Sequence, residues 1–216
     1  MRDAPDVRGF SDGRGLVFST ASRGCAVKFP VPRPPLPSRE AAAASVGWNV
    51  CKTLAQMVVF WGVLLFVMPL WIWRIERTQE WTLPGLHQPW IVWTGVVVFC
   101  LSSVLGISSA WVVAKYGAGT PLPFDCPRRL VLRGAYCFVR NPMAIAGLCQ
   151  AIGVGLYLGS WGVLAYTACG FFVWNYLVRI WEEDDLHARF GDSYDKYRAN
   201  VRCWWPRTRP YKDHDC

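Results

Sequence analysis

The chain has 216 residues, of which 53% are hydrophobic and 18% are charged, with 13 Trp and a formal net charge of +8. Soluble domains carry about 25% charged residues, so this composition disfavours a soluble globular enzyme, and the long apolar runs exclude disorder as the main state. The nine cysteines are scattered without a Cys-x-x-Cys pair, so neither a disulfide framework nor a metal site is predicted. Basic residues lie between apolar runs rather than in one patch, which favours anionic lipid head groups over nucleic acid as the partner.

Residues 1–45 predict a flexible tail. Gly, Ser and Arg are frequent in its first half, and a proline-rich tract at 29–38 can form neither a helix nor a central strand. The tail lacks the short apolar core of a secretory signal, so we expect the first apolar helix to stay as an uncleaved anchor. Residues 46–216 are expected to form one domain.

Three stretches contain no Asp, Glu, Lys or Arg. Residues 54–73 and 90–114 are each long enough, at ~1.5 Å per residue, to cross a ~30 Å hydrocarbon core. Residues 141–178 are too long for one span and are interrupted by Gly159-Ser160-Trp161-Gly162, which predicts a helical hairpin with arms 143–158 and 163–178. At roughly 24 Å each, these arms are marginal spans that need support from other helices.

The basic residues predict the orientation of these helices. Eight precede the first helix, two follow it, five lie before the hairpin and eight come after it. Because Lys and Arg accumulate on the cytoplasmic side, both termini and the loop 115–140 are expected to be cytoplasmic. The predicted fold is all-α: an integral membrane protein with about four transmembrane helices, the last two a hairpin, and a cytoplasmic C-terminal helical segment.

The polar residues that could carry chemistry flank the hairpin. Before it comes Arg140-Asn141-Pro142, for which a purely structural reading is strong, because Asn is a good N-cap, Pro fits the first helical position and Arg anchors to phosphates. After it come four adjacent carboxylates at 182–185, next to a membrane helix. A cationic ligand would explain them; alternatively, Arg179 pairs with one of the two glutamates at helical spacing and the aspartates face water.

A larger set of short motifs surrounds these residues in a fixed order. The set comprises Gly117, Gly119, Thr120, Pro121, Pro123, Pro127-Arg128, Gly134, Tyr136, Val139-Arg140-Asn141-Pro142-Met143, Glu182-Glu183, Phe190-Gly191, Tyr194, Tyr197 and Trp205-Pro206-Arg207. Around a charge-free hairpin, it resembles the isoprenylcysteine carboxyl methyltransferase and phospholipid methyltransferase superfamily of integral membrane proteins, over about residues 50–207. Asn141, Ala144 and Ala146 replace the His, Tyr and Gly of the family's Arg-His-Pro-x-Tyr-x-Gly signature, which points to a different acceptor or cofactor contact.

The resemblance implies an S-adenosylmethionine pocket at the cytoplasmic face, within residues 117–207, and an acceptor that arrives from the bilayer. The cofactor-binding residues that it implies are Tyr136, Arg140, Asn141, Pro142, Met143, Glu182, Glu183, Tyr194 and Tyr197. The glutamates could hold the ammonium or the ribose hydroxyls, Arg140 with Asn141 the carboxylate, and the tyrosines could face the sulfonium. Tyr194 and Tyr197 fall with Phe190 on one helix face, which is more typical of packing.

The acceptor stays open between a prenylcysteine carboxylate, a phosphatidylethanolamine amine and a small lipophilic thiol or alcohol. Arg140 and Glu183 are the candidate catalytic residues, and an amine acceptor would need Glu183 as its base, whereas a carboxylate would need none. His187 is expected to be an exposed helix residue. The competing hypothesis is a non-catalytic four-helix scaffold or small transporter, for which the apolar runs offer few polar groups: Gln56, Gln150 and Asn175.

Overall fold

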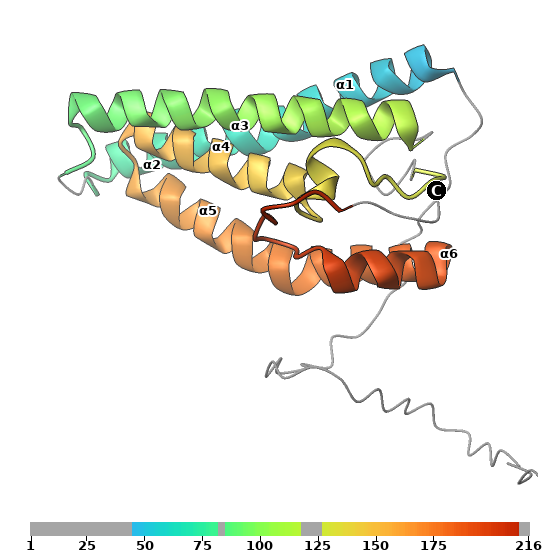
Figure 1. Cartoon of the computed structure of the whole chain (residues 1–216). Coiled ribbons are helices and arrows are strands. Elements are labelled where there is room, and N and C mark those ends of the chain that lie inside the picture. The colour runs from blue at the N-terminus through green and yellow to red at the C-terminus, as the bar shows by residue number, and fades with distance from the viewer. Residues whose placement is uncertain (1–44, 82–84, 118–126, 212–216) are drawn as a thin grey trace, which may run out of the picture. The chain divides into compact units, whose positions relative to one another are not determined.

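The computed structural model describes residues 45–81, 85–117 and 127–211, and all regular secondary structure in these ranges is helical. The predicted tail therefore lies outside the described residues, except for Ser45. Figure 1 shows the helices running along a common direction as a bundle. The all-α fold class is confirmed.

The first continuous helix of the bundle, which we call a rod, runs from Val46 to Thr78. It consists of α1 (Val46–Gly62), the π-helical segment η1 (Val63–Val67) and α2 (Met68–Thr78). Ser45 caps it by accepting a hydrogen bond from the Trp48 amide at 3.3 Å. The rod extends beyond the predicted 54–73 at both ends, because backbone hydrogen bonding continues past the apolar run into residues that water or head groups can solvate.

The next two rods pack closely along each other. They are α3 (Pro89–Tyr116) and α4 (Pro142–Leu158), which confirm the predicted helices 90–114 and 143–158. Gly95 and Gly153 face each other so closely that a Cβ on Gly95 would lie 2.7 Å from the carbonyl oxygen of Gly153. Small residues at a membrane helix interface permit this approach of two backbones. With 17 residues, α4 is about 26 Å long, which is short for a membrane span. Its close packing against α3 gives it the support that such a short helix requires.

The hairpin turn consists of two residues. Gly159 has φ 61° and ends α4 in the left-handed conformation, and the Ser160 hydroxyl accepts from the Val163 amide at 3.1 Å. Because Ser160 is the cap, α5 (Trp161–Val173) begins two residues before the predicted start. It continues without a break through the π-helical η4 (Trp174–Val178) into α6 (Arg179–Asn200), so the predicted arm 163–178 is part of a longer helix.

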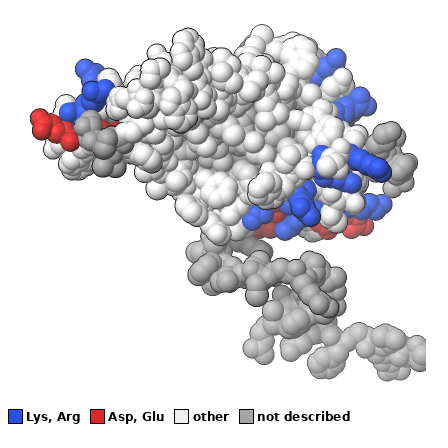
Figure 2. Space-filling model, turned by 60° about the vertical axis from the view of Figure 1, so that its left-hand side comes forward, with Lys and Arg blue, Asp and Glu red and all other residues white. Residues whose placement is uncertain are grey.

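Within the described ranges, three helices are long and apolar enough to cross a membrane: Val50–Thr78, Pro89–Tyr116 and Trp161–Asn200. The apolar part of the last one ends at Val178, and the charged residues from Arg179 onward place α6 outside the hydrocarbon core. In Figure 2 the acidic and basic side chains gather at the two ends of the bundle and leave an uncharged band between them. The protein is therefore an integral membrane protein.

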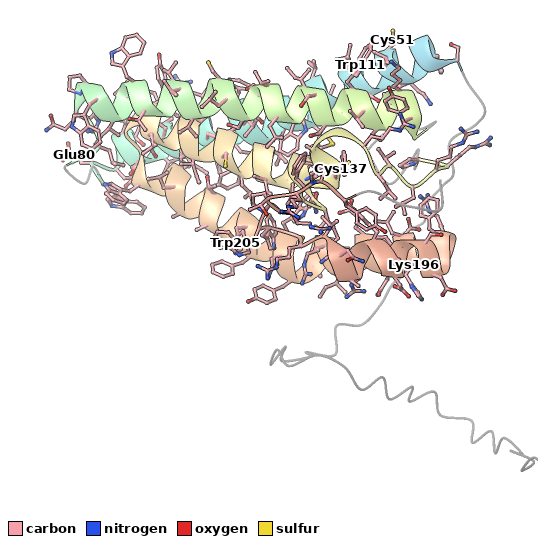
Figure 3. The ribbon with its side chains drawn as sticks, in the orientation of Figure 1. Cys51, Glu80, Trp111, Cys137, Lys196 and Trp205 are labelled. Atoms are coloured by element: carbon pink, nitrogen blue, oxygen red, sulfur yellow. The ribbon has the colours of Figure 1, made fainter. Side chains whose placement is uncertain are left out.

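One end of the bundle holds most of its polar structure, and we call residues 127–141 and 179–211 the polar end. The short 3₁₀ helix η3 (Gly134–Cys137) lies here, before α4. Residues 201–211 run along 137–140 through backbone hydrogen bonds: the amide of Arg140 donates to Arg202 at 3.0 Å, and that of Arg207 donates to Phe138 at 2.9 Å. In Figure 3, Cys137 and Lys196 mark this end and Glu80 marks the opposite one.

Candidate functional site

Arg140 and Asn141 are placed by the start of α4. Pro142 occupies the first helical position, as predicted, and Asn141 is the N-cap residue with φ −125°. The Asn141 side chain does not cap the helix, however. Its Nδ2 instead donates to Oε2 of Glu182 at 3.4 Å, which brings the segment before α4 against α6.

Glu183 is the centre of an ion-pair cluster. Only 7% of this residue is exposed. Its Oε1 accepts from Nη1 of Arg140 at 2.8 Å and from Nη1 of Arg179 at 3.3 Å, while its Oε2 lies 3.2 Å from Nη2 of Arg198. The pairing with Arg179 is the helical i, i+4 contact that the structural reading of the sequence anticipated.

The cluster carries more positive than negative charge. Three guanidinium groups share one carboxylate, and Nε of Arg140 is buried without a hydrogen-bond partner. A buried unpaired donor next to surplus positive charge is energetically unfavourable unless an anionic group satisfies it. The arrangement therefore fits a ligand that carries a carboxylate.

Glu182 has different surroundings. The neutral amide of Asn141 is its hydrogen-bond partner, and the side chain keeps an exposed face. The protein around it still removes part of its hydration, and this burial, followed by the neighbouring Glu183 carboxylate, raises the pKa of Glu182 to about 7. Glu182 is thus a carboxyl group that reaches solvent and that a cationic ligand group would stabilise in its charged form.

The three tyrosines of the sequence prediction lie in this region but mostly within its packing. Tyr194 and Tyr197 are 2% and 3% exposed and form a small core with Val201. The Tyr197 hydroxyl donates to the backbone oxygen of Tyr136 at 2.8 Å, which ties α6 to η3. Tyr136 is partly buried, and burial, followed by the nearby Glu182 carboxylate, raises the pKa of its hydroxyl. The periodicity that indicated packing is confirmed for Tyr194 and Tyr197.

Of the other predicted positions, some lie within the described residues and some lie outside them. Pro142 is buried and Met143 is partly buried in the first turn of α4. Gly117 ends α3, and its carbonyl oxygen accepts from the Arg128 amide at 2.7 Å. Gly119, Thr120, Pro121 and Pro123 lie outside the described residues. His187 is exposed, as expected, and Nδ1 of its ring is 3.0 Å from Asp195.

Sequence reasoning missed two parts of the site. Arg198 reaches Glu183 across a kink at Gly191, whose φ of 52° and ψ of −131° interrupt the helical geometry of α6. The segment 201–211 is the second: it pairs with 137–140, and Nε1 of Trp204 donates to Oδ1 of Asn175 at 2.9 Å. The Trp205-Pro206-Arg207 motif was the signal that this segment belongs to the region.

Comparison with known families gives the class of the protein. A family model described as phospholipid methyltransferase matches residues 90–193, from the first turn of α3 into α6. The matched segment contains Arg140, Asn141, Glu182 and Glu183, and it confirms the resemblance stated above. Over these residues the chain is similar to the phospholipid methyltransferase family, which supports a membrane methyltransferase as its general class. No curated protein and no solved structure gives a significant match to the chain.

Proposed function

We propose that the protein is an S-adenosylmethionine-dependent methyltransferase that transfers a methyl group to a lipophilic or amphipathic acceptor at the membrane. The observation that carries the proposal is the position of the family match. It covers Arg140, Asn141, Glu182 and Glu183, which the fold brings together at the polar end although the two pairs are far apart in sequence.

The side chains at the polar end fit the polar groups of this cofactor. The buried, unpaired Nε of Arg140 and the amide of Asn141 suit a carboxylate, and Glu182 suits an ammonium or the ribose hydroxyls. When bound, S-adenosylmethionine supplies a methyl group on a sulfonium that is already a good leaving group. The contribution of the chain is then to bind and orient the reactants, which by itself accounts for much of a rate enhancement.

The acceptor and the sidedness of the site remain part of the proposal. The uncharged band of the bundle gives a lipophilic acceptor access from the bilayer, and both carboxylate and amine acceptors are compatible with the polar end. The distribution of basic residues supports a cytoplasmic location for the polar end and both termini.

The scaffold or transporter hypothesis has less support. Nε2 of Gln150 donates to Oγ of Ser103 at 2.8 Å, and Asn175 accepts from Trp204. These are two of the polar groups that a transport path through the apolar helices would use. Both have partners inside the protein, as expected of groups that stabilise contacts between helices.

The test is binding of S-adenosylmethionine and S-adenosylhomocysteine to the detergent-purified protein by calorimetry. We expect saturable binding that is lost in Arg140→Ala and strongly weakened in Glu182→Gln. Asp192→Asn is the matched control, because it removes an exposed carboxylate from the same helix. A folded wild-type protein that binds neither compound would contradict the proposed function and return the scaffold hypothesis to first place.

A further inference from the structure

The two adjacent glutamates at the start of α6 have unequal freedom to bind a ligand. Both oxygens of Glu183 are engaged by guanidinium groups, and the residue is buried. Glu182 has an exposed face, and its carboxylate accepts a hydrogen bond of 3.4 Å from a neutral amide. A ligand can reach Glu182 directly, whereas it could reach Glu183 only by displacing an arginine.

Glu183 connects three separate parts of the polar end. Arg140 comes from the segment before α4, Arg179 from the first residue of α6, and Arg198 from beyond the Gly191 kink. Oε1 of Glu183 holds Arg140 and Oε2 holds Arg198, so one rigid carboxylate joins the two guanidinium groups. The side chain of Arg198 is 48% exposed. Its Nη2 contacts the Glu183 carboxylate, so Arg198 is linked to Arg140 through Glu183.

The position of Arg140 is defined from two directions. Its backbone amide donates to Arg202 at 3.0 Å, and Nη1 of its guanidinium donates to Glu183 at 2.8 Å. With Nη1 held by Glu183, the orientation of the remaining guanidinium donors, including the unpaired Nε, is fixed. Partners of this kind, which hold a ligand-binding group without touching the ligand, commonly change affinity by 10-fold or more when removed.

Resting on the proposed function, we propose that Glu183 is a positioning residue and neither a ligand nor a base. It orients Arg140 toward an anionic group of the cofactor. We call the chain of contacts from Arg198 through Glu183 to Arg140 the relay, and Arg198 is its outer member. Glu182 is the glutamate of the pair that faces the ligand. Glu183, which the sequence analysis named as the candidate base, is thereby given a different role, and its neighbour Glu182 is the one that contacts the ligand.

A double-mutant cycle on S-adenosylhomocysteine affinity tests the relay. We expect Arg198→Gln to weaken binding by about 5-fold and Glu183→Gln by about 50-fold, and we expect Arg198→Gln to add almost nothing in the Glu183→Gln background, because coupled residues are not additive. Arg198→Lys should recover part of the loss. Arg129→Gln removes an exposed positive charge from the same end and is expected to leave affinity unchanged.

Two results would overturn the assignment while leaving the proposed function intact. One is that the wild type and Arg198→Gln bind S-adenosylhomocysteine with the same affinity. The other is a full additive loss in the double variant, which would mean that Arg198 and Glu183 act separately. Arg198 is half-exposed, so its variants report on the relay even if Glu183→Gln fails to fold; absence of binding by the wild type would instead contradict the methyltransferase proposal.

Discussion

The two ends of the bundle each contain a buried glutamate, and the partners of these glutamates differ. At the end opposite the polar end, Glu76 is 8% exposed and accepts hydrogen bonds from the Ser160 hydroxyl and from the Gly162 amide, the latter at 3.3 Å. At the polar end, Glu183 is 7% exposed and is paired with three arginines. Burial is the same, but one site uses neutral donors and the other uses cations.

The difference separates a structural contact from the proposed binding site. Glu76 joins α2 to the first turn of α5, where a helix N-terminus favours a carboxylate, and its neutral donors add no positive charge to the site. Glu183 is surrounded by surplus positive charge and an unpaired Arg140 Nε. Glu76 also lies before residue 90, outside the family match, whereas Glu183 lies inside it. Buried acidic residues in membrane proteins therefore need to be judged by the charge of their partners.

The largest effect is expected from Glu183→Ala. Three guanidinium groups would lose their shared anion, and breaking a buried ion-pair cluster in this way costs about 3 kcal/mol of stability. Binding of S-adenosylhomocysteine should disappear as well. Thermal unfolding in detergent and calorimetry measure the two effects; an unchanged affinity would show that the polar end does not bind the ligand through Arg140.

Glu76→Ala should lower stability without affecting binding. The Ser160 hydroxyl and the Gly162 amide would lose a buried acceptor, at a cost of about 2 kcal/mol. S-adenosylhomocysteine affinity is expected to match that of the wild type once the protein is folded. If this variant lost affinity in proportion to Glu183→Ala, the contrast between the two ends would not hold.

Glu182→Gln should change how stability depends on pH. The folded-state pKa of Glu182, about 7, lies above its ordinary value of 4.5, so the folded state disfavours the charged carboxyl. The resulting destabilisation grows as pH rises from about 4.5 to about 7 and is then complete. We therefore expect the unfolding temperature of Glu182→Gln to rise relative to that of the wild type as pH increases across this interval. The Asp192→Asn control should show no such trend.

The smallest effect is expected at the middle of the bundle. Gln150→Leu removes the hydrogen bond to Ser103, and such contacts between membrane helices are worth about 0.6 kcal/mol. Neither ligand affinity nor methyl transfer should change. A loss of function in this variant, with the protein still folded, would favour the transport hypothesis over the enzymatic one.

The sequence predicted the spans better than the ends of the helices. Charge-free runs identify where a chain can lie in hydrocarbon, and they located the ends of α3 and α4 to within two residues. They do not mark where helical hydrogen bonding stops. Arg179 ends the apolar run but not the helix, which continues into α6 as far as the kink at Gly191. Ser160 caps α5 before the glycine that suggested a wider turn.

The site residues were predicted from the family resemblance, and local spacing predicted their contacts only where the backbone is regular. The contact of Arg179 with Glu183 follows from the i, i+4 rule. Arg198 could not be found this way, because Gly191 changes the direction of α6 before it. Asn141 was correctly placed as the N-cap residue, but its side chain turns to Glu182 because the opposing helix offers a charged acceptor.

The backbone pairing of residues 201–211 with 137–140 also has a consequence for biosynthesis. All the membrane helices precede residue 201, so during translation the bundle can insert before the Arg140 amide has its partner in Arg202. The pairing can therefore be completed only after the membrane helices have been synthesised. A chain that stops at residue 200 would reach the membrane with its helices in place and its Arg140 amide unpaired.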